Sequence, residues 1–174
     1  MSTTLKDHVY RKRGELAGTL HLPMAGLAND CLTAVGDREG LTAKLSAGRA
    51  GVPHCTRLYV LDARGLQVSD SVTALGVVSA DCGRDHSDAP SWSESMPPWG
   101  FLLSDSYVNP LTHHPCLSAL HAIRQEGETL GFVGADFDLR DLPVAPGFYD
   151  EPVHWQQIKG DPSIRSTVFQ QCRV

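Results

Sequence analysis

The chain has 174 residues, of which 41% are hydrophobic and 20% are charged. This composition is typical of one soluble globular domain and excludes a disordered or collagen-like chain. Fifteen Lys and Arg residues stand against 20 Asp and Glu residues, so the formal net charge is −5. An acidic balance argues against non-specific nucleic-acid binding. The sequence has no run of about 18 apolar residues that would predict a membrane-spanning helix.

The five cysteines are widely spaced, and no two of them form a CxxC pair. They are Cys31, Cys55, Cys82, Cys116 and Cys172. An odd number of scattered cysteines indicates reduced, mostly buried thiols rather than a disulfide framework. Residues 1–18 carry basic residues and no apolar run, which does not fit a secretory signal. Together these features predict a cytoplasmic protein.

Apolar residues at helical spacing predict a helix in the first part of the chain. They are Leu5, Val9, Leu16, Leu20, Leu27 and Leu32. We expect Pro23 to kink or break this helix into two segments, and Gly36 to end it. Asp37 is then a candidate N-cap for a shorter helix that includes Leu41 and Leu45.

Residue alternation with a period of two predicts strands from residue 58 onward. The expected strands are 58–61, 66–69, 100–108, 115–124 and 129–139. The first two would form a hairpin whose turn ends at Gly65, and a polar loop over 81–98 would follow them. Strands that are close in sequence should pair antiparallel. The pattern therefore predicts an α+β domain, with long N-terminal helices packed on a five-stranded antiparallel sheet.

The last expected strand has two chemically different faces, because alternate residues point to opposite sides. Val133 and Phe137 belong to an apolar face that should pack on the helices. Asp136 and Asp138 lie on the other face, about 7 Å apart, and Gly134 beside them leaves room for another group to approach. These carboxylates are a candidate binding site. The alternative is that they are solvated at the strand end or cap the following segment.

Motifs for phosphate binding, zinc proteolysis and serine hydrolysis are missing from the sequence. The candidate metal ligands are Cys82 with His86, His54 with Cys55, and the group His113, His114 and Cys116. None of these has the spacing of a strong zinc site, and no Cys–His nucleophile pair is supported. We expect no catalytic residue, no metal and no cofactor, and we expect His121 to line the core or a pocket wall.

Three stretches share a pattern with a known family. They are residues 58–65, residues 83–92, and the region from 104–107 through Pro115 to 130–139. These stretches resemble the PAS-like sensor domains called Cache or PDC domains. Together with the N-terminal helices, the resemblance covers residues 5–142. It implies a long helix packed against a five-stranded antiparallel sheet, and members of the family are usually ligand-binding sensors of chemoreceptors and sensor kinases.

The chain is also similar to stand-alone cytoplasmic proteins that consist of a PDC sensor domain. This similarity implies N-terminal helices over 1–50, the sheet and its pocket loop over 51–142, and a C-terminal extension over 143–174. Such relatives continue past residue 174, so we expect the extension to be truncated. The N-terminal helices are candidates for a homodimer interface, and neither a nucleic acid nor a membrane is an expected partner of this chain.

The resemblance places a small-molecule pocket between the sheet and the 81–98 loop. Asp136 matches an aspartate that receives the ligand's ammonium group, and Tyr59 and Tyr107 match pocket aromatics. Asn109 stands where the family has an aspartate. Ala89 stands where an arginine clamps the ligand's carboxylate, so an amine without a carboxylate, or a small polar neutral molecule, is the expected ligand.

Two further loop residues are candidates to replace the missing clamp, namely Arg84 and His86, and Trp92 would cover the ligand. The expected ligand-binding residues are therefore Tyr59, Arg84, His86, Trp92, Tyr107, Asn109 and Asp136. The main alternative function is a regulatory or dimerisation module without a ligand, in which Trp92, Tyr107 and Phe132 fill the pocket. An enzyme is a third option, but no acid–base set is visible.

Overall fold

The computed structural model describes residues 5–89, 92, 96–110 and 112–142. The expected C-terminal extension over 143–174, with Cys172, lies outside the described residues. The elements in chain order are α1 (Leu5–Leu32), α2 (Arg38–Gly48), the 3-10 helix η1 (Arg49–Gly51), β1 (Arg57–Asp62), β2 (Ser71–Thr73), β3 (Gly76–Val78), the 3-10 helix η2 (Ser79–Asp81), β4 (Phe101–Leu103), β5 (Tyr107–Val108), β6 (Pro115–Gln125) and β7 (Glu128–Asp138).

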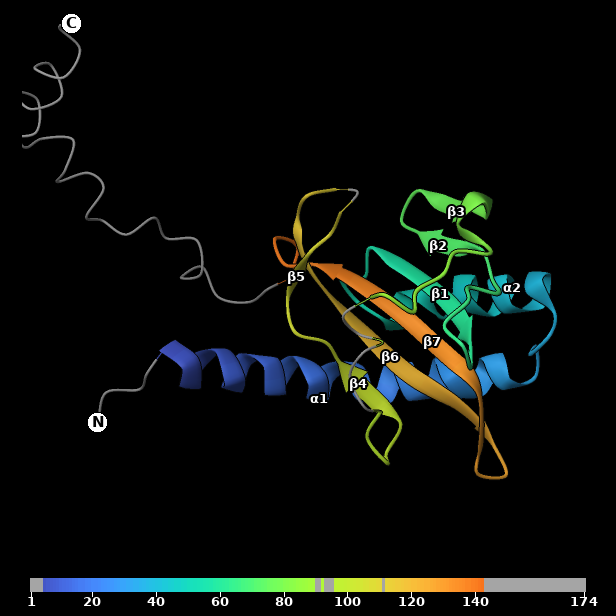
Figure 1. Ribbon diagram of the computed structural model, residues 1–174, viewed down its shortest axis with the longest axis horizontal. Helices are drawn as coiled ribbons and strands as arrows, with labels where there is room; N and C mark the ends of the chain where they lie inside the picture. Colours follow the sequence, from blue (N-terminus) through green and yellow to red (C-terminus); the bar gives the residue numbers. More distant parts are fainter. Residues whose placement is uncertain (1–4, 90–91, 93–95, 111, 143–174) are drawn as a thin grey trace, which may run out of the picture. The chain divides into compact units, whose positions relative to one another are not determined.

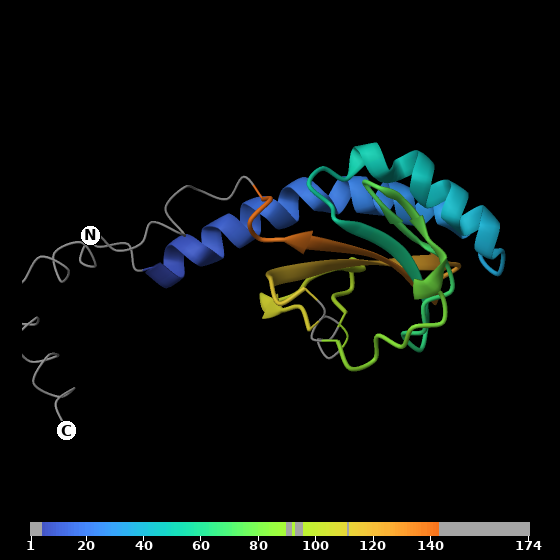
Figure 2. The same cartoon turned by 90° about the horizontal axis from the view of Figure 1, so that it is seen from above.

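The strands form one antiparallel sheet in the order β3-β2-β1-β7-β6-β4, and β5 also pairs with β6. Its centre is the hairpin of β6 and β7, which are 11 residues long each. Figures 1 and 2 show α1 and α2 on one face of this sheet and the described part of the chain between β3 and β4 on the other. The predicted α+β architecture, with N-terminal helices on an antiparallel sheet, is confirmed.

The predicted break at Pro23 is wrong, because α1 continues through it as one helix of 28 residues. A proline inside a helix removes one hydrogen bond and crowds the preceding turn. Against this cost, α1 buries Leu20, Met24, Leu27 and Cys31. Burial of an apolar stripe over several turns outweighs one local defect. The second helix begins after Asp37 as expected, although the Asp37 side chain makes no capping hydrogen bond.

Two predicted strands differ from the observed ones. Residues 66–69 form no strand and touch β1 through an isolated bridge between Leu61 and Gln67, because β1 pairs with β2 further along the chain. The expected strand over 100–108 is divided into β4 and β5, which both pair with β6. Ser104 lies between them, and its backbone N–H donates to the Ser118 carbonyl.

The predicted faces of β7 are confirmed. Val133, Ala135 and Phe137 are each 0% exposed, and α1 packs on both β6 and β7. Phe132 and Asp136 alternate with them on the opposite face and are only partly buried. The sheet thus has a dry face under the helices and a second face that is available for a site.

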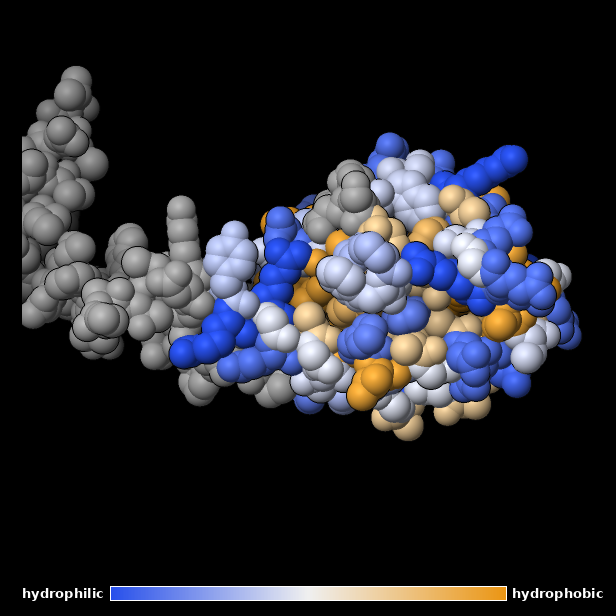
Figure 3. All heavy atoms as spheres, turned by 90° about the horizontal axis from the view of Figure 1, so that it is seen from below, coloured by the Kyte–Doolittle hydropathy of each residue, from blue (hydrophilic) through white to orange (hydrophobic). Residues whose placement is uncertain are grey.

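The described helices do not combine the length and the apolar character that crossing a membrane requires. On the side of the molecule shown in Figure 3, hydrophobic residues in orange lie scattered among hydrophilic residues in blue. That view shows the mixed surface that is ordinary for a globular domain.

We expect Val133→Asp to lower the free energy of unfolding by about 3 kcal/mol or more, because it buries an unpaired charge between the sheet and α1. Val77→Asp is the matched control, since Val77 is exposed on edge strand β3. Chemical denaturation of both variants measures the difference. Equal stabilities would contradict the assignment of the buried face.

Candidate functional site

The candidate site lies on the face of the sheet opposite the helices, where Asp136 of β7 has neighbours on both sides. The register places Arg57 of β1 opposite Asp136 on one side and Ser118 of β6 opposite it on the other. Tyr59 stands opposite Gly134 in the same ladder. Because side chains alternate along each strand, Arg57, Tyr59, Ser118 and Asp136 all point to this face.

Hydroxyl groups converge on one oxygen of Asp136. The Tyr59 hydroxyl donates to Oδ1 at 2.9 Å, and the Ser118 hydroxyl donates to the same atom at 2.7 Å. The Tyr107 hydroxyl lies 2.9 Å from Ser118 Oγ. An ionised carboxylate only accepts hydrogen bonds, so the Ser118 hydroxyl donates its one proton to Asp136. Tyr107 must therefore be the donor in its hydrogen bond with Ser118. Three hydroxyl protons are therefore directed toward one carboxylate.

Burial raises the pKa of every titratable group in this network. For the phenols this favours the form that donates the hydrogen bond, whereas for Asp136 it disfavours the ionised form that accepts it. Burial raises the pKa of Tyr59 well above its usual value and that of Tyr107 to about 12, so both phenols stay protonated. Burial also raises the pKa of Asp136, although the bonds from Ser118 and Tyr59 oppose this shift. The ionised carboxylate is thus only partly compensated, since no described side chain hydrogen-bonds its Oδ2.

His86 reaches the site through a stacking contact. Its ring lies on Tyr59 with centroids 4.8 Å apart and planes inclined by 24°. Its Nε2 is 3.0 Å from Gln67 Oε1. Because the Gln67 amide nitrogen already donates to the Ser69 carbonyl and to Ser71 Oγ, His86 must be the donor and carries its proton on Nε2. Burial lowers the pKa of His86, which favours the neutral ring.

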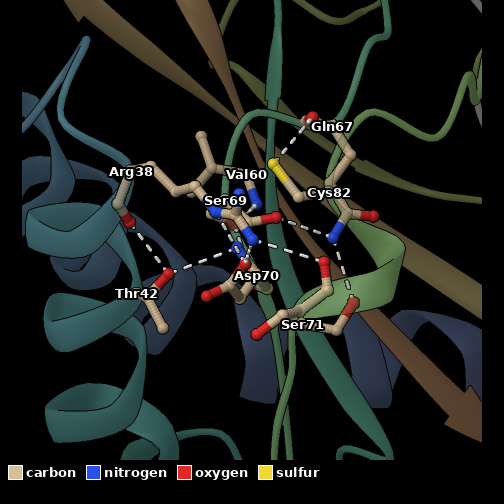
Figure 4. A network of polar contacts seen from close by, with 9 residues as sticks. Arg38, Thr42, Val60, Gln67, Ser69, Asp70, Ser71 and Cys82 are labelled. Carbon is tan, nitrogen blue, oxygen red and sulfur yellow. Dashed lines mark hydrogen bonds and ion pairs between the residues drawn. The ribbon is translucent and has the colours of Figure 1, made fainter.

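Gln67, which is 1% exposed, belongs to a polar network that extends to α2 (Figure 4). Ser69 Oγ accepts from the backbone N–H of Val60 in β1. The backbone N–H of Asp70 donates to Thr42 Oγ1, and Arg38 of α2 pairs with the Asp70 carboxylate. The segment that positions His86 is therefore attached to both β1 and α2.

Gly134 is required by the close approach of the Tyr59 ring. A Cβ atom at this position would overlap carbon atoms of that ring. The sequence had placed Gly134 beside the two carboxylates as a point of close approach, and in the structure the approaching group is a neighbouring side chain. The Tyr59 ring lies across Gly134, and this brings its hydroxyl to Asp136.

Trp92 lies over the apolar part of the same face. It contacts Phe132 edge to face with centroids 5.2 Å apart. With Met96 and Phe132, it packs against the buried side chains of a cluster formed by Tyr59, Leu61, Leu102 and Leu120. The covering role expected for Trp92 remains a prediction, since its neighbours are side chains of the domain itself.

The contacts given for the remaining candidates are to other residues than Asp136. Arg84 pairs with Asp81 at 2.8 Å, and Asn109 accepts a hydrogen bond from the Thr112 backbone in the turn before β6. Ala89 accepts a bond from the Trp92 backbone N–H. The structure thus brings together Tyr59, His86, Tyr107 and Asp136 of the expected set. The binding roles expected for Arg84, Trp92 and Asn109 remain predictions.

Sequence reasoning missed Arg57, Gln67 and Ser118. Arg57 precedes the expected strand 58–61 by one residue, and extending the alternation would have placed it on the face of Tyr59. Ser118 lies inside a correctly expected strand, but only the register with β7 brings it next to Asp136. Gln67 carried no signal, because its contacts depend on the chain path after the turn at Gly65.

Asp138 has a structural role, unlike Asp136. Its carboxylate accepts from Arg140 Nε at 3.0 Å and from the Arg140 terminal nitrogen at 2.7 Å. His114 Nδ1 lies 3.0 Å away. Hydrogen bonds from Arg140 lower the pKa of Asp138 to about 2. This matches the alternative in which the carboxylate serves the strand end.

In the described part of the chain, no three His, Cys, Asp or Glu side chains come together as a metal site. Cys31, Cys55, Cys82 and Cys116 are free thiols. Burial raises the pKa of Cys31 and Cys55 to about 12, so neither is an activated nucleophile. His121 is partly buried and stacks on His21 of α1, in keeping with a core position under the helix.

We expect Gly134→Ala to lower the free energy of unfolding by about 1–3 kcal/mol, because the methyl group displaces the Tyr59 ring. Gly26→Ala in α1 is the control, since nothing lies within 4 Å of a Cβ there, and it should not destabilise. Thermal unfolding measures both. Equal melting temperatures for Gly134→Ala and the wild type would contradict the close approach of Tyr59.

The two acidic residues should give opposite pH dependence. The pKa of Asp138 is lowered, so its contribution is present at neutral pH and disappears as the pH falls toward about 2. We expect Asp138→Asn to cost about 1–2 kcal/mol at neutral pH and nothing near the pKa of Asp138. The pKa of Asp136 is raised, so the wild type loses stability relative to Asp136→Asn as the pH rises. Denaturant midpoints across the acid range test this, and equal pH trends for the two variants would contradict it.

No family model matches the chain, and no curated protein matches it. Many solved structures are similar to it in fold, including the following three. The ligand-binding domain of the Pseudomonas fluorescens chemoreceptor CtaA in complex with L-isoleucine has a TM-score of 0.54 and 17% identity over 78% of this chain and 53% of its own. The corresponding domain of Pseudomonas aeruginosa PctB in complex with L-Gln has a TM-score of 0.55 and 18% identity over 80% of this chain and 56% of its own.

An extracellular ligand binding receptor from Desulfohalobium retbaense has a TM-score of 0.57 and 15% identity over 76% of this chain and 25% of its own. The chain thus spans about half the length of the chemoreceptor domains that it matches. These neighbours are receptor domains rather than enzymes. The described part of the chain therefore has the fold of the Cache/PDC-like sensor domains.

Proposed function

We propose that this domain senses a small polar molecule, which binds around Asp136 on the face of the sheet opposite the helices. The observation that carries the proposal is the direction of the hydroxyl network. The hydroxyls of Tyr59 and Ser118 donate to Asp136, and the Tyr107 hydroxyl donates to Ser118. Within this hydroxyl network, the atoms left for a ligand are the free oxygen of the carboxylate and hydroxyl lone pairs, and all of these are acceptors.

A site of acceptors favours a ligand with several N–H donors, such as an ammonium group. Burial raises the pKa of Asp136, because the hydrogen bonds from Ser118 and Tyr59 only partly compensate the ionised form. A bound cation would stabilise that form further. The fold neighbours support a sensory role, because their structures contain L-isoleucine and L-Gln.

The alternative module with a self-filled pocket has one observation in its favour. Trp92, Met96 and Phe132 pack on the buried cluster that includes Tyr59. These side chains occupy the apolar part of the face and leave the polar network at its edge. The two functions differ in one respect, since only the sensory domain gains stability from a small molecule.

A thermal-shift screen of amines, amino acids and small carboxylates tests the proposal. A ligand at about 100 times its Kd stabilises the folded state by about 2.7 kcal/mol. We expect donor-bearing ligands to raise the melting temperature of the wild type and to have no effect on Asp136→Asn, which lacks the carboxylate charge.

Asp138→Asn is the matched control, because it makes the same change two residues along the same strand. Its baseline melting temperature should fall, whereas its response to ligand should equal that of the wild type. Equal ligand responses in the wild type and Asp136→Asn would overturn the assigned site. A wild type that no compound stabilises would instead favour the self-filled module.

A further inference from the structure

Arg57 is a second charged residue of the site, and nothing in the sequence marked it as such. Its backbone stands opposite that of Asp136 in the ladder of β1 and β7, so both side chains point to the same face. Its side chain is only 26% exposed. A cation therefore lies beside the carboxylate. Its charge opposes the rise that burial causes in the pKa of Asp136.

The guanidinium of Arg57 is poorly bonded for its burial. Within the described residues, its one ion pair is to Asp81 Oδ2 at 3.4 Å, and it makes no hydrogen bond there. Arg84, in contrast, pairs with Oδ1 of the same carboxylate at 2.8 Å. Asp81 is 4% exposed, and its Oδ2 has no hydrogen-bond partner among the described groups. A guanidinium has five N–H donors in a planar fork, so Arg57 retains donors that can receive an acidic group.

The charges around the site also restrict the ligand. Arg57 and Arg84 balance Asp81 and Asp136, so these four residues sum to zero. A ligand with a single positive charge would leave an excess charge in a partly buried site, which is costly. A zwitterion keeps the balance, because its ammonium faces Asp136 and its acidic group faces Arg57.

We propose that Arg57 binds the acidic group of a zwitterionic ligand, whose ammonium group is bound by Asp136. This inference rests on the proposed function and adds an anionic end to the ligand. The acid, a carboxylate or a sulfonate, is held from strand β1 rather than from the loop position occupied by Ala89. The planar fork of arginine matches such groups with two hydrogen bonds.

Calorimetric titration with matched ligand pairs tests this assignment. Each pair consists of an amino acid and the amine left after removal of its carboxylate, namely L-leucine with isoamylamine and γ-aminobutyrate with propylamine. In the wild type, the acid-bearing member of at least one pair should bind about 10- to 100-fold more tightly than its amine, the ratio expected for one or two charge-assisted hydrogen bonds.

Arg57→Gln should reduce this ratio to about 1 and leave the affinity for the amine within a few-fold of the wild type. Arg64→Gln is the control, because it removes an exposed arginine in the turn after β1 that belongs to neither the site nor the Asp81 ion pairs, and it should keep the ratio. Arg57→Lys retains the charge without the planar fork and should give an intermediate ratio. It serves as the test variant if Arg57→Gln fails to fold, as judged by its melting curve.

Two results would overturn the role of Arg57 while the proposed function stands. These are equal affinities for acid and amine in the wild type, or an unchanged ratio in Arg57→Gln. A ratio lost equally in Arg57→Gln and Arg64→Gln would also overturn it, since that pattern does not depend on where the arginine lies. Failure of every ligand to bind the wild type would overturn the proposed function and this inference with it.

Discussion

The site depends on one partly buried carboxylate that is held by hydroxyl groups. Asp136 stands in the central ladder of the sheet, and the strands on either side supply Tyr59 and Ser118 as donors. This arrangement imposes further requirements. Gly134 must lack a side chain so that the Tyr59 ring can lie across it, and His86 stacks on the outer face of that ring.

The buried amide of Gln67 connects this centre to the rest of the domain. It orients His86 on one side and joins the serine network on the other, and that network continues to Asp70 and Thr42 of α2. Each of its bonds has a defined donor, so the amide has one orientation only. The position of His86 is thus connected through Gln67 to contacts of α2 as well as to the site.

The sequence predicted the helices, the long strands and the two faces of β7, because alternation over 11 residues is a strong signal. It failed at Pro23, where burial of the apolar stripe of α1 overrides a local preference. It also missed Arg57, since a partner across the sheet depends on register and not on spacing along one chain segment. Asp136 was found through family resemblance and alternation together. The cytoplasmic location remains a prediction from the cysteines.

The raised pKa of Asp136 has a consequence for any cation that binds there. A carboxyl group that is protonated over a wider range of pH must release its proton before it can pair with an ammonium group. Ligand binding is then coupled to proton release. The apparent affinity falls on acidification before an ordinary aspartate would titrate, and the observed heat of binding depends on the ionisation enthalpy of the buffer.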